Sequence, residues 1–314
     1  MKKLLLITLA ILTLTSLVYS QNSPAKKNGW ETDNLRGKVK SYTQSKYGAE
    51  DRFGEIQKTL SSKDTYKFDD KGNKIEENTY YGDGKLNGKK TCKYDDKGNQ
   101  IEENYYKADG SFGGKYTCKY DDKGNKMEEN YYNADGSLSY KDTCQLSYKV
   151  IYKYDAKGNQ IEENYYNADG SLNLRDICKY DDKGNLIEEN YYNADGSLDH
   201  KYTYKYDAKG NQIEENYYNA DGSLELKYTY KYDDKGNKIE ENTYLRDGIF
   251  SKYTYKYDAK GNQIEENYYN ADGSLSYKDI YKYEFDGKGN WIKRITFKNQ
   301  IPKSIYEREY EYYE

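Results

Sequence analysis

Residues whose types and spacing suit catalysis are scarce in this chain. His200 is its one histidine, so a multi-histidine metal centre is excluded. It occupies the place that Leu226 holds in an equivalent segment, and we expect its ring to pack against neighbouring side chains. A residue that recurs in every repeat is most simply explained by the architecture. We therefore expect no catalytic residue, no metal and no cofactor.

The recurring sequence IEEN carries adjacent carboxylates, as at Glu214 and Glu215. Neighbours in a strand point to opposite faces, so the two do not form a catalytic acid–base pair. We expect them to pair with Lys227 or Lys231 across strands.

The recurring NADGSL is similar to part of an EF-hand loop, which binds calcium. Tyr217 and Tyr228, however, stand where the first and twelfth ligands must be carboxylates. The sequence therefore predicts no calcium site.

Four cysteines are the remaining reactive groups, and three of them replace a tyrosine of the repeat. Equivalent positions in successive hairpins lie two strands apart, roughly 9–10 Å, whereas a disulfide needs Cα atoms within about 7 Å. We therefore predict free thiols on the buried face. If the units stacked instead as single strands about 4.8 Å apart, Cys92 and Cys118 would be close enough to bond. The four are Cys92, Cys118, Cys144 and Cys178.

These residues sit in a repeat marked by the tripeptide KGN, which occurs nine times between Lys71 and Lys288, mostly 26 residues apart. A fixed period of this length indicates a repeat array. In SLELKYTYKY, Tyr228 and Tyr230 share one face and Lys227 shares the other with Thr229, as in a β-strand.

Two turns complete each unit. DDKG begins with Asp233 and ends with Gly236, and NADG begins with Asn219 and ends with Gly222. Both patterns suit tight turns between antiparallel strands. NKIEENTY and its equivalents supply the second strand, so each unit is predicted to be a β-hairpin.

The fold class predicted is all-β: a long antiparallel sheet of about nine hairpin units, twisted or coiled into a spiral. Whether Ile213 and Tyr217, or instead Tyr218, join the tyrosine-rich face depends on turn register and stays open. The eight extra residues between Cys144 and Lys153 are even in number, so the lengthened strand is expected to keep its apolar face.

The predicted organisation has four parts. Residues 1–20 form a signal peptide, 21–64 a linker with capping strands, 65–290 the repeats, and 291–314 the C-terminal capping strands. Capping is expected because an open array exposes unpaired edges.

The composition suits an exported protein rich in tyrosine. One third of the residues are charged and the mean hydropathy is −1.26, values typical of disorder. The 43 tyrosines and only two prolines favour an ordered chain instead, because tyrosine rings supply apolar area. The net charge of −4, with both signs interspersed, argues against a nucleic-acid partner.

The N-terminus has the layout of a secretory signal peptide, with two lysines, an apolar run and small residues. Cleavage is predicted between Ser20 and Gln21, although a retained anchor is the alternative. The mature protein is expected to be exported to the periplasm, the cell surface or the medium, with no membrane span after processing.

The frame YKYDAKGNQIEENYYNADGSLELKYTYKYD resembles the YD repeats of the RHS family over residues 66–290. That resemblance implies antiparallel strands wound into a spiralling sheet, which serves as a toxin shell or as an adhesion scaffold. Few residues follow Asn290, so a stand-alone scaffold is expected. NYYNADGSL is also similar to choline- and glucan-binding repeats, and GKLNGKKTCKYDDKGN to MORN-type hairpins.

The functional expectation is an exported, non-enzymatic scaffold that binds a protein or glycan partner. The alternative is a cell-wall or polysaccharide-binding protein that uses exposed tyrosines, and a hydrolase in the terminal segments is a third hypothesis. The candidate binding aromatics are Tyr166, Tyr192, Tyr218 and Tyr269.

The cysteine prediction is tested by intact-mass measurement after denaturing alkylation without reductant. Four adducts are expected, one for each free thiol, because neighbouring units hold the sulfur atoms too far apart to bond. A protein that takes up no adduct would show that all four cysteines are oxidised.

Overall fold

The computed structural model describes residues 27–138, 149–167, 169–246 and 248–314. The predicted cleavage residues Ser20 and Gln21 lie outside this part of the chain. The described residues form one short helix, α1 (Gly29–Thr32), and one antiparallel sheet of twenty strands. The strands are β1 (Val39–Arg52), β2 (Glu55–Phe68), β3 (Lys74–Tyr81), β4 (Leu86–Tyr94), β5 (Gln100–Lys107), β6 (Phe112–Tyr120), β7 (Lys126–Asn133), β8 (Lys149–Tyr154), β9 (Gln160–Tyr166), β10 (Leu172–Tyr180), β11 (Leu186–Asn193), β12 (Leu198–Tyr206), β13 (Gln212–Asn219), β14 (Leu224–Tyr232), β15 (Lys238–Leu245), β16 (Gly248–Tyr257), β17 (Gln263–Asn270), β18 (Leu275–Phe285), β19 (Trp291–Lys298) and β20 (Ile301–Tyr312).

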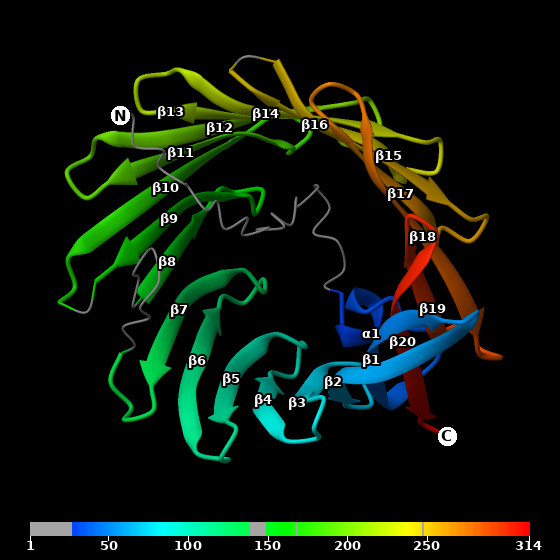
Figure 1. The fold of residues 1–314 in the computed structure, drawn as a ribbon. Helices are drawn as coiled ribbons and strands as arrows, with labels where there is room; N and C mark the ends of the chain where they lie inside the picture. The colour runs from blue at the N-terminus through cyan, green and yellow to red at the C-terminus, as the bar shows by residue number, and fades with distance from the viewer. Residues whose placement is uncertain (1–26, 139–148, 168, 247) are drawn as a thin grey trace, which may run out of the picture.

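The sheet closes on itself, as the ring of strands in Figure 1 shows. Each strand pairs with its neighbours in sequence, and β1 also pairs with β20 from Val39↔Tyr312 to Gly48↔Ser304. The predicted all-β antiparallel class is confirmed, but the open, spiralling sheet is wrong. The terminal segments do not cap two free ends, because they pair with each other and leave no edge strand in the ring.

Closure at twenty strands gives a wide barrel. A strand spacing of about 4.8 Å implies a backbone diameter of about 30 Å or more. Described side chains from opposite walls therefore do not meet, and the described residues form no packed core at the centre of the barrel. Among the described residues, a cluster of buried apolar side chains lies at the seam, where Val39, Tyr42 and Phe68 pack together.

The KGN turns are closed by the aspartate that precedes them. Asp95 Oδ1 accepts the backbone N–H groups of Lys97 and Asn99, at 3.0 and 2.7 Å, and Asn99 Nδ2 donates to Asp95 Oδ2 at 2.8 Å. Gly98 has a φ of +78°, which glycine adopts without steric cost. The sequence D-x-K-G-N is thus a self-contained turn that recurs along one rim of the barrel.

Bulges explain why the sheet curves into a ring. The pairing of β12 with β13 shifts register between Lys205 and Tyr206, and the pairing of β13 with β14 shifts between Tyr217 and Tyr218. Equivalent shifts occur in most strand pairs, for example between Lys231 and Tyr232. Each bulge bends its strand and increases the local twist. Regular alternation in the sequence does not reveal them.

The observed register settles which tyrosines share a face. Tyr217 lies opposite Tyr202 of β12, so it joins the tyrosine-rich face. Tyr218 lies opposite Lys201 and joins the lysine-bearing face. The second carboxylate of IEEN, Glu215, also joins the tyrosine face, because it lies opposite Tyr204.

The tyrosine-rich face is the inner face of the barrel. Trp30 of α1 packs against the seam cluster, together with Leu35 and Tyr66. Tyr66 is the equivalent of Tyr204, and Figure 1 shows α1 inside the ring. We call the tyrosine-rich side of the sheet the inner face and the lysine-bearing side the outer face.

Tyrosine hydroxyls tie successive hairpins together. Tyr232 donates to the carbonyl of Gln212 at 2.8 Å, and Tyr180 donates to that of Gln160 at 2.7 Å. The acceptor belongs to the first residue after the preceding KGN turn, on the adjacent strand. The last tyrosine of YKY therefore links most of the described hairpins to the one before, whereas the Tyr206 hydroxyl has no hydrogen-bond partner.

Most of the eight-residue insertion lies outside the described residues, between 139 and 148. From Lys149 onward β8 is in register with the other units, since Val150 lies opposite Glu129. Val150 and Tyr152 are both buried. Within the described segments no helix is long and apolar enough to cross a membrane.

Candidate binding surfaces

The outer face is organised around the first carboxylate of IEEN. Glu214 accepts Lys205 Nζ on one strand and Lys227 Nζ on the other, both at 2.7 Å. Asn216 Nδ2 donates to the same carboxylate at 3.0 Å. The predicted pairing with Lys227 is thus present, whereas Lys231 pairs with Glu240 of the next unit at 2.8 Å.

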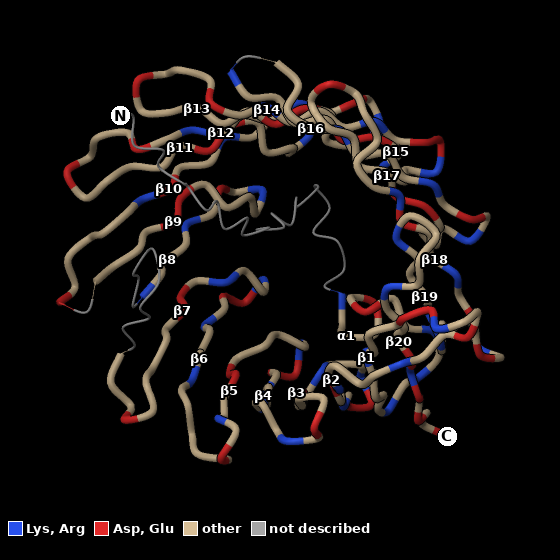
Figure 2. The backbone as a smooth tube through the Cα atoms, in the orientation of Figure 1, with Lys and Arg blue, Asp and Glu red and all other residues tan. Residues whose placement is uncertain are grey.

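This three-strand arrangement recurs around the barrel, and Figure 2 shows acidic and basic residues interleaved along the ring. Burial raises the pKa of Glu214, but hydrogen bonds from Asn216, Lys205 and Lys227 outweigh it and lower the value to about 2. Four equivalent glutamates are also each paired with two lysines, whose hydrogen bonds outweigh burial and lower the pKa to about 2. They are Glu76, Glu128, Glu240 and Glu265.

The four predicted binding aromatics all lie on the outer face and are half-buried. Lys201 Nζ lies 5.0 Å from the ring centre of Tyr218, and the Arg175 guanidinium lies 5.4 Å from that of Tyr192. Tyr166 lies opposite Lys149 and Tyr269 lies opposite Lys252 in the strand register. The rings of Tyr192 and Tyr218 are therefore each partly covered by a cation, and all four rings are partly open to solvent.

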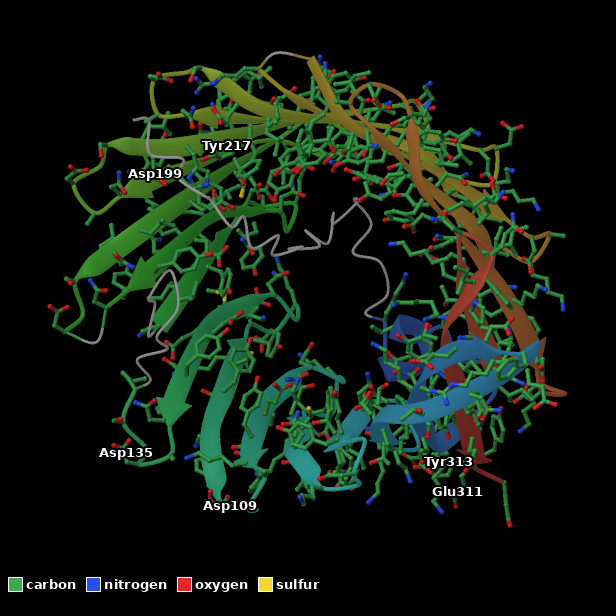
Figure 3. All side chains as sticks on the ribbon, viewed as in Figure 1. Asp109, Asp135, Asp199, Tyr217, Glu311 and Tyr313 are labelled. Carbon is green, nitrogen blue, oxygen red and sulfur yellow. The ribbon has the colours of Figure 1, made fainter. Side chains whose placement is uncertain are left out.

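Tyrosine–glutamate pairs fill the inner face. Tyr152 donates to Glu129 at 2.6 Å, and Tyr204 donates to Glu189. Rings in the same strand also stack, as Tyr228 does on Tyr230 with centroids 6.4 Å apart. Figure 3 shows side chains along the strands of the whole ring. Where the repeat places a phenol beside a buried glutamate, the hydrogen bond between them satisfies both groups.

Three of the inner glutamates have pKa values shifted in the opposite direction to those of the outer ones, whereas Lys126 keeps the pKa of the inner Glu129 lowered. Burial raises the pKa of Glu215, and hydrogen bonds from Gln212 and Tyr230 only partly oppose it. Burial likewise raises the pKa of Glu163 and Glu189.

The rim opposite the KGN turns carries exposed aspartates from the NADG turns. Figure 3 shows Asp109 and Asp135 at two of these turns. Asp135 Oδ1 accepts the backbone N–H of Ser137 at 2.9 Å. These carboxylates hold their own turns closed.

Three of the predicted thiols lie among the described residues, and none of these three is in a disulfide. Cys118 and Cys178 are buried and Cys92 is half-buried, at places that tyrosines occupy in other units. Cys144 lies outside the described residues. His200 stacks on Tyr191 with centroids 4.3 Å apart, in a packed environment.

One group was missed from the sequence. Asp176 occupies the place of Tyr202, two residues before Cys178 on the inner face of β10. The signal was the sequence DIC where three other units have YTY and one has YTC. Asp176, Cys178 and Glu189 each offer a donor atom within 4.8 Å of the other two.

No family model matches the chain, and no curated protein matches it. Among solved structures, TcdB2-TccC3-Cdc42 aligns with a TM-score of 0.31 and 14% identity, over 79% of this chain and 16% of that chain. The chain thus spans about a sixth of that protein. A porin-like protein from Bacteroides uniformis aligns with a TM-score of 0.36 and 9% identity, over 87% and 98%. A porin-like protein from Bacteroides vulgatus aligns with a TM-score of 0.29 and 15% identity, over 87% of this chain and 98% of that chain. Structural similarity at these TM-scores and identities supports no inference about function.

The two carboxylates of one IEEN sequence are predicted to affect stability in opposite directions. Glu214→Gln should lower the free energy of unfolding at pH 7 by about 0.5–1 kcal/mol, because it removes the charge that two lysines bind. The folded pKa lies below the ordinary value of 4.5, so this loss should shrink as the pH falls from about 4.5 toward 2.

The matched variant Glu215→Gln should instead raise stability at pH 7, because it removes a buried charge while keeping an acceptor for Tyr230. Its folded pKa is raised, so the ionised form is the destabilising one and the gain should disappear in acid. Denaturant unfolding of both variants across pH measures the effects. Equal shifts of the same sign would contradict the two-face assignment.

Proposed function

We propose that this protein is an exported, non-enzymatic scaffold whose closed ring of hairpins presents its outer face to a protein or glycan partner. The observation that carries the proposal is the repetition of one outer surface element, a half-buried tyrosine beside Lys–Glu–Lys pairs, around the ring. The stand-alone array is proposed to be related to YD repeats through its sequence frame.

Ring closure restricts how a partner is bound. A sheet with free edges can accept an added strand from another protein. Here β1 pairs with β20, so the backbone hydrogen-bonding groups at the ends of the sheet are already used. Recognition is therefore assigned to side chains on the faces and rims.

The exposed lysines of the outer face also indicate whether water or lipid surrounds the barrel. Lys231 and Lys256 have side chains that are 67% and 64% exposed, and equivalent lysines follow around the barrel. Charged side chains on a lipid-facing strand cost roughly 2–4 kcal/mol each near the middle of a bilayer. We place the outer face in water, in keeping with an exported protein without a membrane span after processing.

A polysaccharide of the cell wall is the second candidate partner. Its support is the spacing of the outer tyrosines, because equivalent rings recur every second strand, roughly 9–10 Å apart. Identical sites at a fixed spacing bind a repeating ligand with avidity. Sugar rings stack on tyrosine, and the adjacent lysine and asparagine side chains supply polar contacts.

The proposal is tested with a variant that replaces Tyr166, Tyr192, Tyr218 and Tyr269 by serine. Binding to purified cell wall or to a glycan array should fall at least tenfold, because several equal contacts are lost together. Inner-face Tyr217→Thr is the matched control, since Thr243 already occupies the equivalent place.

Point substitutions are preferred over truncation, which would open the ring. Binding that is lost only in the outer-face variant supports the polysaccharide partner. If neither wall nor glycan binds, capture of an envelope protein that depends on the same tyrosines supports the scaffold with a protein partner. Partner binding unaffected by the four substitutions would contradict the outer-face assignment.

A further inference from the structure

The inner face departs from its repeat at β10 and β11. Asp176 and Cys178 stand on β10 at positions that several other units, such as that of Tyr202 and Tyr204, fill with tyrosine. Cys178 lies directly opposite Glu189 of β11, and Asp176 lies opposite Glu163 of β9. Three carboxylates and one thiol therefore gather on three adjacent strands.

The centre of this group is buried and incompletely bonded. Asp176 is 3% exposed and Cys178 is 6% exposed. The Asp176 Oδ1 atom has no hydrogen-bond partner, and Oδ2 accepts the thiol of Cys178, with the sulfur 3.8 Å away. A buried carboxylate oxygen without a partner is costly and calls for an unseen ligand.

Other cysteine units contain a cation at this place. Opposite Cys118, Glu129 pairs with Lys126 at 2.6 Å. Opposite Cys92, Glu103 lies 3.7 Å from Lys90.

The unit of Cys178 has no equivalent lysine. Leu186 occupies the position of Lys126, and Asp176 that of Lys90. Among the described residues, neither Asp176 nor Glu189 forms an ion pair with a lysine or arginine. Compared with the units of Cys118 and Cys92, Leu186 and Asp176 thus remove the lysine that pairs with the glutamate. Asp176 also adds a carboxylate.

We propose that Asp176, Cys178 and Glu189 bind a divalent transition-metal ion, with Zn²⁺ as the preferred ion. Their donor atoms lie within 4.8 Å of one another. Zinc bonds of about 2.0–2.3 Å place donors within about 4 Å of each other, so a small contraction completes the site. One thiolate and two carboxylates suit the borderline softness of zinc better than they suit calcium or magnesium.

Binding involves no redox step. The Cys178 thiol loses its proton to solvent, the thiolate sulfur donates an electron pair to the ion, and each carboxylate donates one oxygen. Glu189 keeps its second oxygen for the Tyr204 hydroxyl, which orients it as an outer-shell partner. Glu163 supplies further negative charge opposite Asp176.

The test uses the full mature chain, with Zn²⁺ in calorimetry and Co²⁺ as the spectroscopic probe. One equivalent of metal should bind, and Co²⁺ should produce a thiolate charge-transfer band. Asp176→Tyr and Cys178→Tyr restore the residues that other units carry, so they should fold normally and bind at least tenfold more weakly. Cys118→Tyr is the matched control and should keep both the band and the affinity.

Leu186→Lys is the second variant. It should supply the cation that Lys126 provides to Glu129, and so weaken Zn²⁺ binding without removing a ligand. Melting curves recorded without metal establish that each variant is folded. A thiolate band that is absent from the wild type, or that persists in Cys178→Tyr, would overturn the proposal, as would Zn²⁺ affinity unchanged by Leu186→Lys.

Discussion

The structure depends on the cross-strand register that places the two carboxylates of each IEEN sequence on opposite faces. Glu214 is held on the outer face by lysines from both neighbouring strands, whereas Glu215 lies on the inner face beside the Tyr230 phenol. A slip of one residue would exchange these environments, putting a lysine-bound carboxylate among tyrosines and a phenol-bound one in water. Because each hairpin repeats the constraint, one register is imposed on most of the ring.

Closure of the ring determines which surfaces of the repeat stay available for binding. Bulges bend each strand, and β1 meets β20, so the chain becomes a wide ring with two distinct faces and two rims of turns. Most recurring polar groups stabilise this architecture: the turn aspartates close their turns and the inner carboxylates accept phenol hydroxyls. What stays available is a periodic outer surface, together with the places where the repeat is interrupted. The proposed binding role of the outer face and the proposed metal site at Asp176 rest on those two kinds of feature.

Much of the fold could be predicted from local pattern. Alternating tyrosines predicted the strands, and Asp and Gly at fixed positions predicted the turns, because both depend on nearby residues. Closure could not be predicted, since it depends on bulges and on pairing between segments 250 residues or more apart in the chain. The ion-pair partner of Lys231 could not be predicted, because it depends on the register between two strands joined by a turn. The sequence left that register open. The Asp176 group escaped notice because Cys178 had been treated as a substitute for tyrosine, without regard to the aspartate two residues earlier.

The central claim, a closed ring, is tested most directly by zero-length carbodiimide crosslinking. Lys40 Nζ lies 2.6 Å from Glu311 and Lys58 Nζ lies 2.7 Å from Glu307, so both pairs join the two ends of the chain across or beside the seam. In an equal mixture of unlabelled and heavy-nitrogen-labelled protein, we predict monomers in which these pairs are linked within one isotopic form. The Lys231–Glu240 pair serves as a positive control, because it crosslinks in an open or a closed sheet. Control crosslinks without seam crosslinks, or seam crosslinks only between differently labelled chains, would contradict closure.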